Sequence, residues 1–395
     1  MTPAARVQAA IELLDEIIFA ARDGGPAADT LIARYFKTRR YAGSKDRRAV
    51  RDHVYAAIRR AGERPDSGRA AMVGLARAHP HIAALFNGSP HGPAPIVADE
   101  PGAMASTVPS WLLPMLAPLL DAEEEQTKLL ERAPLDLRVN RLKAERDPVL
   151  AQLPDGKPTR MSPDGIRLPE GWPVEQTALW KDGLVEVQDE GSQIIARLCE
   201  AQPGQTVIDL CAGGGGKTLA LAADMDEQGR LIAADTIRSR LSRLAPRADR
   251  AGALFIESLL MDQGHEARAL SAFEGTADCV LIDAPCSGTG TWRRNPEGRW
   301  RLSPARLERL VAEQARIMDI GAGLAVKGGT MVYAVCSLLD REGREQVDAF
   351  FRRNPGWTCD LPKDLPGRRH GEGVLMTPAH DGTDGFFFAR MKKSW

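Results

Sequence analysis

The feature that most constrains the fold of this chain is a short apolar run followed directly by a loop with reactive side chains. The run CVLI at 279–282 has the length and the branched side chains of a buried parallel strand. The stretch Asp283–Glu297, DAPCSGTGTWRRNPE, follows it directly. In open α/β sheets, ligands bind just beyond the carboxyl ends of the strands. The sequence therefore predicts that Asp283 and Cys286 lie at a sheet edge where chemistry occurs, although a strand that simply ends in a turn shares part of this pattern.

Composition leaves room for two or three domains and argues against several classes of protein. The chain has 395 residues, of which 43% are hydrophobic and 27% charged, and its formal net charge is −1. Any affinity for nucleic acid must therefore come from local patches. Six cysteines without a CxxC pair fit a reducing compartment. We find no membrane-spanning run, signal peptide or metal-ligand spacing, and we expect a cytoplasmic protein without a metal site or an obligate protein partner.

The first 132 residues are predicted to form an all-helical domain. Apolar residues recur at helical spacing over 4–22, and further helices fit 28–36, 46–61 and 110–132. Residues 133–180 read as a small α+β connecting segment with a strand at 135–140 and a short helix at 147–153.

One part of the helical region is strongly basic. From Arg34 to Arg60 there are ten Lys and Arg residues against two Asp and Glu residues, with Tyr35, Phe36 and Tyr41 interleaved. Basic side chains mixed with aromatic rings suit a surface that binds a phosphate backbone and stacks bases. The same charges would also suit a solvated helix face.

From about residue 181 strands and helices alternate, which predicts a mostly parallel sheet. A strand at 205–210 runs into the glycine-rich loop CAGGGGKT at 211–218 and then into a helix. Such a loop can cradle a phosphate, a dinucleotide or a methyl donor. A Walker-type phosphate loop lacks its first glycine here, because Cys211 stands there, and the dinucleotide pattern is met only loosely.

Acidic residues after successive strands favour the methyl donor. Asp209 ends the strand before the loop, and Asp235 ends the next strand, where an acid would bind ribose hydroxyls. Asp262 follows a strand-like segment at 253–257, and Asp283 follows the fourth strand. We therefore expect a site for S-adenosylmethionine.

The last part of the chain supplies a second cysteine at a strand end. A long amphipathic helix is predicted over 303–326, capped by the KGG sequence at 327–329, and a strand at 330–335 runs into Cys336. The segment FFFAR at 386–390 is expected to be an edge or hairpin strand of the same sheet. The remaining cysteines of this half, at positions 199, 279 and 359, are expected to be buried packing residues.

Five motifs resemble those of the Sun-type (Nol/Nop/Sun) RNA cytosine-5 methyltransferases, above all the bacterial 16S ribosomal RNA members. They are VQDEGSQ at 187–193, DLCAGGGGKT at 209–218, DAPCSGTGTWRRNPE at 283–297, VYAVCS at 332–337 and DGFFFA at 384–389. The helices around GSKDRRAVRDHVYAAIRR at 43–60 are similar, less specifically, to the antitermination-factor-like RNA-binding domain of those members.

The resemblance implies an α/β fold class with three parts. A Rossmann-like S-adenosylmethionine-dependent methyltransferase domain with a doubly wound, mostly parallel sheet is expected at 181–395. An all-α RNA-binding domain at 1–132 and the small α+β connecting segment at 133–180 would precede it. The implied reaction transfers a methyl group to C5 of a cytosine in RNA, most of all 16S ribosomal RNA, through a covalent cysteine–C6 adduct.

The resemblance also implies roles for individual residues. The nucleophile falls on Cys336, the cysteine that assists product release falls on Cys286, and Asp283 is shared between the cofactor pocket and the target base. The expected cofactor-binding residues are Cys211, Ala212, Gly213, Gly214, Gly215, Gly216, Lys217, Asp235, Arg240, Asp262 and Asp283. The expected RNA-binding residues are Arg39, Arg40, Lys45, Arg47, Arg48, Arg293 and Arg294, with Trp292 available for stacking.

Two departures from the family pattern concern the site. Gly213 and Gly214 replace an Ala-Pro pair, and Val335 replaces the Thr that normally precedes the nucleophile. We expect both to leave activity intact.

The assignment of the nucleophile has a rival. A Pro-Cys pair supplies it in DNA cytosine-5 methyltransferases, and Pro285-Cys286 is such a pair. The attacking thiol must be partly ionised, and Asp283 could donate to the base only if burial kept it protonated. Alternative functions are a P-loop-like nucleotide-hydrolysing protein and a catalytically silent RNA-binding ribosome-assembly factor.

Overall fold

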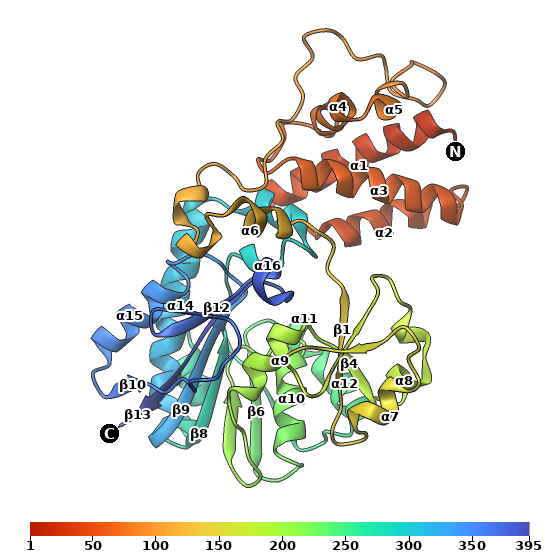
Figure 1. Cartoon of the computed structure of the whole chain (residues 1–395). Coiled ribbons are helices and arrows are strands. Elements are labelled where there is room, and N and C mark those ends of the chain that lie inside the picture. The colour runs from red at the N-terminus through yellow and green to blue at the C-terminus, as the bar shows by residue number, and fades with distance from the viewer. Residues whose placement is uncertain (395) are drawn as a thin grey trace. The chain divides into compact units, whose positions relative to one another are not determined.

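The computed structural model describes residues 1–394, and the chain forms two compact units (Figure 1). One unit comprises Met1–Glu131 and Thr291–Pro304, and the other comprises Arg132–Gly290 and Ala305–Trp395. The terminal residue Trp395, at the end of the expected 181–395 domain, lies outside the described residues. Among the described residues no helix is long and apolar enough to cross a membrane.

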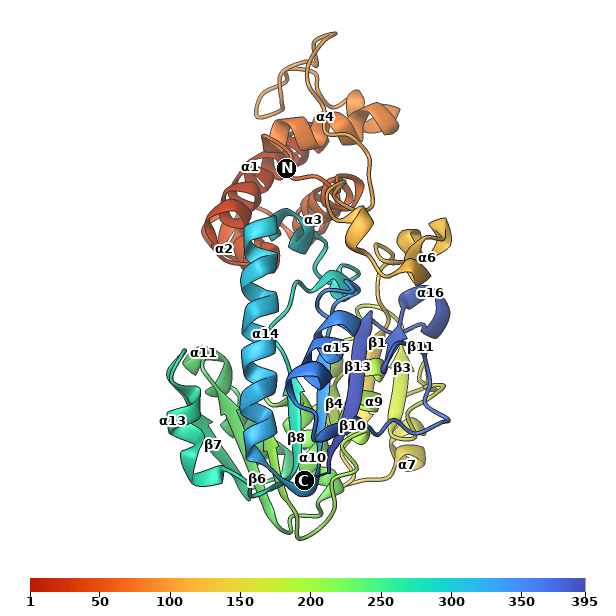
Figure 2. The same cartoon turned by 90° about the vertical axis from the view of Figure 1, so that its left-hand side faces the viewer.

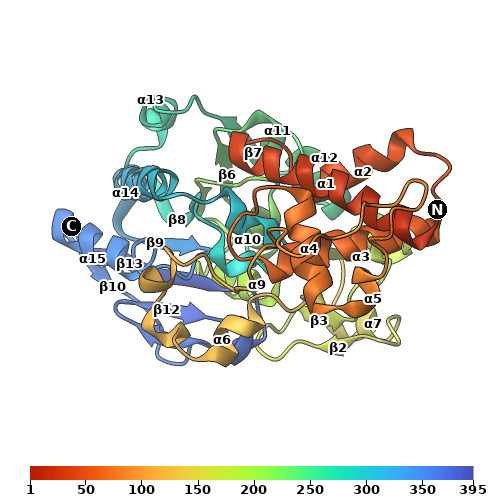
Figure 3. The ribbon, with the colours of Figure 1, turned by 90° about the horizontal axis from the view of Figure 1, so that it is seen from above.

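The first unit is built from helices around one apolar core. Its helices are α1 (Pro3–Asp23), α2 (Ala28–Thr38), α3 (Ser44–Arg60), α4 (Gly68–Ala78), α5 (Pro80–Ala83) and α6 (Glu123–Lys128). Figure 3 shows α1 and α4 crossing each other. The two helices approach so closely at Gly68 that a Cβ there would lie 2.1 Å from the carbonyl oxygen of Ile11. The first three predicted helices are confirmed with small shifts at their ends.

The continuous helix predicted over 110–132 is wrong. Only two 3₁₀ turns, η1 (Leu113–Met115) and η2 (Pro118–Leu120), and the short helix α6 form there. Pro114 and Pro118 explain the difference, since each lacks the backbone donor that a continuous helix needs and lies in the first two residues of a separate 3₁₀ turn.

An insertion from the second half of the sequence completes the helical unit. The segment Thr291–Pro304, which contains the 3₁₀ helix η6 (Pro296–Arg301), lies in this unit although the residues on both sides belong to the other. Trp300 is 1% exposed and belongs to the helical core. The stretch Asp283–Glu297, which reads as one motif, is therefore divided between the two units after Gly290.

The second unit begins with a small antiparallel sheet. Its order is β2-β3-β1-β4, from β1 (Leu135–Val139), β2 (Lys157–Pro158), β3 (Gly165–Leu168) and β4 (Val185–Val187). The elements α7 (Arg146–Leu150), η3 (Val174–Gln176) and α8 (Ala178–Lys181) lie between these strands in sequence. The expected connecting segment thus forms most of the small sheet, which belongs to the same compact unit as the larger sheet.

The larger sheet has the order β11-β12-β13-β9-β8-β5-β6-β7, and β10 also pairs with β13. Its strands are β5 (Thr206–Asp209), β6 (Arg230–Asp235), β7 (Ile256–Leu260), β8 (Ala277–Asp283), β9 (Ala325–Val335), β10 (Trp357–Cys359), β11 (Arg368–His370), β12 (Gly373–Met376) and β13 (Phe386–Lys393). The pairs from β7 to β9 are parallel, and β13 joins β9 antiparallel. This is the doubly wound, Rossmann-like sheet that the sequence predicts.

Helices cover both faces of this sheet. Val207, Leu281 and Val332 share a core with α9 (Glu190–Arg197) and α10 (Gly216–Asp224). Alternate residues face the other way, where the side chains of Val280 and Ile282 approach α14 (Pro304–Leu324). Figure 2 shows α14 running along this face beside α15 (Arg344–Arg353). The remaining helical elements, near the strand ends, are α11 (Arg238–Leu241), α12 (Leu244–Ala251), α13 (Glu266–Leu270), η4 (Ser271–Phe273), η5 (Thr289–Thr291) and α16 (Pro378–Asp381).

Three smaller predictions need correction. The KGG sequence at 327–329 lies inside β9, where the pairing with β8 is irregular and Gly328 has a positive φ, so it does not cap α14. The FFFAR strand is β13, which is not an edge because it pairs between β12 and β9, but its antiparallel pairing with the preceding strand β12 confirms the hairpin alternative. Cys359 is exposed because it lies on β10, which among the described residues pairs with β13 alone, whereas Cys199 and Cys279 are buried as expected.

Candidate active site

The carboxyl ends of the parallel strands bring the predicted polar residues to one edge of the sheet. Asp209, Asp235 and Asp283 are the last residues of β5, β6 and β8, and Cys336 follows β9 directly. Because β6, β5, β8 and β9 are parallel neighbours, these four ends lie side by side. The rhythm of strands ending in polar residues therefore builds the site.

The two cysteines that follow β8 and β9 face each other. The Sγ atoms of Cys286 and Cys336 are 3.3 Å apart, and both residues are partly exposed. The hydrogen bond with Cys336, together with burial, raises the pKa of the Cys286 thiol well above its ordinary value. The Cys286 thiol thus retains its proton at neutral pH and can donate a hydrogen bond to Cys336.

Asp283 forms an ion pair that the sequence did not predict. Lys217 Nζ donates to Asp283 Oδ2 at 2.7 Å. Burial disfavours the charge on Lys217, but the Asp283 carboxylate outweighs it and raises the pKa of this ammonium group. The Asp283 side chain is 36% exposed. Asp283 is therefore only partly buried, and one of its carboxylate oxygens is occupied by the Lys217 ammonium group.

The glycine-rich loop has the backbone shape of a ligand cradle. Gly213 and Gly215 have φ values of +56° and +83°, in the left-handed region that favours glycine. A Cβ at Gly215 would lie 2.2 Å from Leu244 Cδ1, whereas one at Gly213 would meet nothing within 4 Å. The backbone at Gly213 thus borders open space, and α10 begins directly after Gly215 with its free N–H groups near the loop.

Two buried carboxylates flank this loop. Asp235 Oδ2 accepts from the Gly213 backbone N–H at 2.8 Å and its Oδ1 accepts from the Ile237 N–H at 2.6 Å, which fixes the loop to the end of β6. Asp209 Oδ2 accepts from Thr218 Oγ1 at 2.7 Å, but its Oδ1 is buried without a hydrogen-bond partner. Burial raises the pKa of Asp209 to about 7.

These features fit the positively charged, nucleoside-bearing S-adenosylmethionine. The loop offers open backbone at Gly213, and Asp209 has an unused acceptor. Of the other expected cofactor-binding residues, Cys211 is partly exposed, and burial raises its pKa well above the ordinary value, so it is a neutral thiol. Asp262, two residues after β7, and Arg240 in α11 are both exposed.

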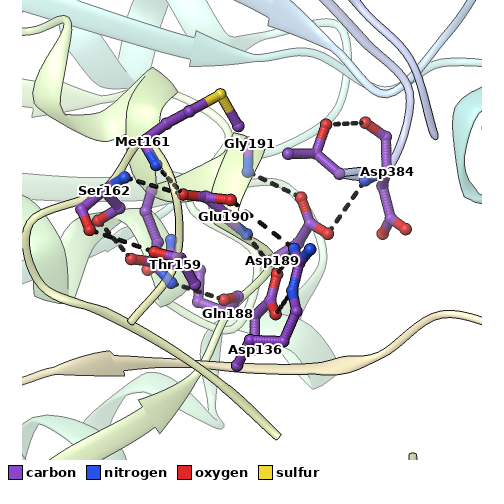
Figure 4. A network of polar contacts seen from close by, with 12 residues as sticks. Asp136, Thr159, Met161, Ser162, Gln188, Asp189, Glu190, Gly191 and Asp384 are labelled. Carbon is purple, nitrogen blue, oxygen red and sulfur yellow. Dashed lines mark hydrogen bonds and ion pairs between the residues drawn. The ribbon is translucent and has the colours of Figure 1, made fainter. Parts of the chain in front are cut away.

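Two motifs without an assigned role meet in one network of polar contacts (Figure 4). In VQDEGSQ, Asp189 Oδ1 accepts from the Gly191 N–H and Oδ2 accepts from the N–H of Asp384, the first residue of DGFFFA. Glu190 Oε1 accepts from the backbone of Ser162, and its own N–H donates to Asp136. The network joins the small sheet, α9 and the start of β13 into one support.

The support reaches the site through an aromatic ring. Phe386, in β13, would lie 2.8 Å from a Cβ at Gly191, so the ring packs directly on the start of α9. Lys217 Nζ lies 6.0 Å from the centre of the same ring. The two motifs thus hold an apolar and aromatic surface beside the Lys217–Asp283 pair.

The basic segment of the helical unit is mostly exposed. Arg40, Lys45, Arg47 and Arg48 face solvent, while the guanidinium of Arg39 stacks 3.5 Å from the centre of the Tyr35 ring. Of the interleaved rings, Tyr35 and Phe36 are buried in the core and only Tyr41, 73% exposed, is free to stack on a base.

The expected rim of Trp292, Arg293 and Arg294 differs from the prediction. All three lie in the helical unit, Trp292 is 1% exposed and Arg293 is also buried. Trp292 is thus unable to stack on a base in this conformation, because its ring fills the interior beside Arg299. Arg294, half-buried, keeps partial access to solvent.

The known proteins similar to this chain include ribosomal RNA methyltransferases. A family model described as 16S rRNA methyltransferase RsmB/F matches residues 196–392. The probable ribosomal RNA small subunit methyltransferase B of Synechocystis is 31% identical over 300 residues, covering 72% of this chain and 67% of that protein. Ribosomal RNA small subunit methyltransferase B of Shewanella oneidensis is 32% identical, covering 75% and 70%, and the probable enzyme of Bacillus subtilis is 34% identical, covering 65% and 59%.

Solved structures support the fold. A protein solved as PH0851 superposes with a TM-score of 0.79 at 22% identity, covering all of this chain and 99% of that one. NSun6 from Pyrococcus horikoshii, solved with SFG, superposes with a TM-score of 0.62 at 19% identity, covering 69% of this chain and 94% of that one. At such identities these likenesses concern the fold alone.

Proposed function

Because the chain belongs to the RsmB/F family of 16S rRNA methyltransferases, we propose that it methylates C5 of a cytosine in small-subunit ribosomal RNA, in the cytoplasm. It is an S-adenosylmethionine-dependent RNA methyltransferase. The observation that supports the cytosine-5 reaction best is the 3.3 Å contact between Cys286 and Cys336 at the ends of neighbouring strands.

The two sulfur atoms suit a covalent mechanism. Cytosine C5 is a weak nucleophile, and a thiolate that adds to C6 makes C5 enamine-like and divides one difficult step into easier ones. We assign this attack to Cys336, since Cys286 holds its proton. S-adenosylmethionine supplies an electrophilic methyl group when bound. After C5 has been methylated, solvent water takes the C5 proton and the electron pair of the C5–H bond restores the C5–C6 double bond. The C6–sulfur bond breaks with its electron pair returning to Cys336, and the thiol of Cys286 stabilises the departing thiolate by donating a hydrogen bond.

Asp283 and Lys217 would orient the base. An ionised Asp283 accepts hydrogen bonds, so it would accept from the exocyclic amine of cytosine, and Lys217 Nζ beside it is the nearest donor to that carboxylate. This differs from a protonated Asp283 donating to N3. The ion pair also argues against the nucleotide-hydrolysing alternative, because the lysine of a phosphate loop must be available to phosphate.

The helical unit would contribute RNA affinity. Arg39, Arg40, Lys45, Arg47 and Arg48 form a basic segment, of which all but Arg39 are exposed, and Tyr41 is beside it. Such groups hold the RNA backbone, while the target base must be unpaired or flipped to reach the cysteines. We retain Arg294 as an RNA contact and regard buried Arg293 as a weaker candidate.

A methyl-transfer assay tests this function. Purified protein is incubated with labelled S-adenosylmethionine and unmodified small-subunit ribosomal RNA, or transfer RNA, and the product is digested to nucleosides. We expect 5-methylcytidine at one position of the ribosomal RNA with wild type and with Cys359→Ala, an exposed cysteine on β10. Cys336→Ala should give none. If S-adenosylmethionine binds but no RNA is labelled by wild type, the silent assembly factor is the better description.

A further inference from the structure

A buried carboxylate lies behind the two cysteine loops. Glu342, in the turn between β9 and α15, is 0% exposed. Its Oε1 accepts from the backbone N–H of Ser287 at 2.8 Å, and its Oε2 accepts from Ser337 Oγ at 2.5 Å. Ser287 and Ser337 are the residues that directly follow Cys286 and Cys336. One side chain therefore binds both cysteine-bearing segments.

Further hydrogen bonds complete this attachment. Gln314 Nε2, from α14, donates to Glu342 Oε1 and to the carbonyl oxygen of Pro285, each at 2.9 Å. The Ser337 hydroxyl also lies 3.1 Å from Ser287 Oγ and 3.2 Å from Thr289 Oγ1. The segment around Cys286 is thus held on both sides of the cysteine, and the Cys336 segment is held through Ser337.

The groups that donate to Glu342 are neutral: a backbone N–H, an amide and a hydroxyl. A buried charge is costly to maintain, and a glutamine could fill the same space with one acceptor. The negative charge therefore calls for an explanation beyond the hydrogen bonds.

The charged groups around the cysteine pair supply an explanation for the carboxylate at position 342. After the contact with Cys336 and burial, the negative charges of Cys336 and Glu342 raise the pKa of Cys286 further. Lys217, from α10, is the cation that interacts with Cys336, besides its partner Asp283 at the end of β8. Tyr333, from β9, also faces the site, and burial holds its pKa so high that it stays neutral. The negative charge of Glu342 thus disfavours a thiolate at Cys286.

We propose that Glu342 is a positioning residue that holds both cysteine loops and that its buried carboxylate keeps Cys286 in the thiol form, which leaves Cys336 as the sulfur that attacks. This inference rests on the proposed function for its purpose, but the proton distribution exists without RNA or cofactor. It explains why two cysteines at the ends of neighbouring strands would differ in reactivity.

Competitive alkylation of the free protein tests the inference. Wild type, Glu342→Gln and Glu345→Gln are treated briefly with iodoacetamide between pH 6 and 9, and label at each cysteine is quantified by peptide mass spectrometry. Glu345 is exposed in the adjacent helix, so its variant matches the change in charge without the buried contacts. We expect wild type and Glu345→Gln to label Cys336 first. The Cys336-to-Cys286 ratio should fall on the order of tenfold in Glu342→Gln, because the carboxylate that disfavours a Cys286 thiolate is removed.

An unchanged ratio in folded Glu342→Gln would overturn the inference. If that variant does not fold, wild type alone decides, because preferential labelling of Cys286 at the lowest pH contradicts it. In methyl transfer, Glu342→Gln should lower kcat and leave the KM for RNA unchanged, and Glu342→Asp, which keeps the charge, should retain the labelling preference. Failure of wild type to methylate any RNA would count against the proposed function and leave the labelling result valid.

Discussion

The two halves of the DAPCSGTGTWRRNPE stretch differ in what they contact. Asp283–Gly290 belongs to the sheet unit, where Gly290 donates to the Cys336 carbonyl oxygen at 3.0 Å and Ser287 donates to Glu342. The following segment, Thr291–Pro304, is part of the helical unit. Neighbours in sequence thus serve separate cores, and the change comes after one glycine.

The second half is attached to the rest of the helical unit mainly by hydrogen bonds to backbone carbonyl groups that are distant in sequence. Arg299, 2% exposed, donates to the carbonyl oxygens of Ile58 and Thr107, and Trp300 Nε1 donates to that of Ala61 at 2.8 Å. Glu297 Oε1 accepts from the N–H of Ala28 at 3.1 Å. From the sequence alone, these arginine and tryptophan side chains could be expected to bind RNA, but in the structure they hold the helical unit together. Charge alone therefore does not distinguish a binding surface from a core.

The largest expected effect on turnover lies in the first half. Cys286→Ala should lower kcat by roughly 10²–10³-fold, the usual effect of removing a hydrogen-bond donor to a developing anion. The unfolding free energy should change by less than about 1 kcal/mol, because the side chain is partly exposed and small. Single-turnover methyl transfer and urea unfolding measure the two quantities. A variant with normal turnover would remove Cys286 from the mechanism.

The largest expected effect on stability lies in the second half. Arg299→Leu should lower the unfolding free energy by about 3–5 kcal/mol, because several buried carbonyl groups lose a charged donor. Burial lowers the pKa of Arg299 to about 9, so the guanidinium is still charged at neutral pH. Circular dichroism during urea unfolding gives the change, and Arg48→Leu on the exposed surface should stay within about 0.5 kcal/mol. Equal effects of both variants would contradict a structural role for the insertion.

A smaller effect concerns pH and the cofactor. With its pKa at about 7 in the free protein, Asp209 is protonated at pH 6 and ionised at pH 8. A positively charged ligand favours the carboxylate, so the affinity for S-adenosylmethionine should rise about fivefold from pH 6 to 8, and binding should release a proton. Titration calorimetry measures both. Asp209→Asn should bind with little dependence on pH, and a wild type without this dependence would place Asp209 away from the ligand.

The smallest effect separates the two basic segments. Arg40→Ala and Arg48→Ala should each weaken RNA binding a few-fold and reduce the slope of log K against log salt by about 0.7–1. Buried Arg293, replaced by Ala, should change that slope little and lower stability instead. Filter binding at several salt concentrations distinguishes these outcomes, and a full unit of slope lost in Arg293→Ala would restore it as an RNA contact.

The sequence predicted the parts of the fold that depend on local pattern. Apolar runs ending in Asp209, Asp235 and Asp283 are visible in one dimension, and parallel pairing necessarily brings their ends together. The expected start of the third strand at residue 253 lies three residues before the observed β7, which does not alter the edge to which Asp262 belongs.

The rest depended on contacts between distant residues. Glu342 lies in the charged sequence DREGRE, where nothing distinguishes it from exposed Glu345, and its burial depends on loops from β8 and on α14. Likewise the hydrogen bonds of the buried Arg299 guanidinium go to carbonyl groups more than one hundred residues away in sequence. Lys217 and Asp283 could each be assigned to the site, but their ion pair required the register of β5 and β8.

Trapping the covalent adduct tests the central assignment most directly. Small-subunit ribosomal RNA transcribed with 5-fluorocytidine retains a fluorine where the C5 proton must leave, so a cysteine–C6 adduct persists after methyl transfer and survives denaturing electrophoresis. We predict that wild type and Cys286→Ala form the adduct, that Cys336→Ala does not, and that the modified peptide contains Cys336. An adduct retained by Cys336→Ala and lost in Cys286→Ala would show that the Pro285-Cys286 pair supplies the nucleophile.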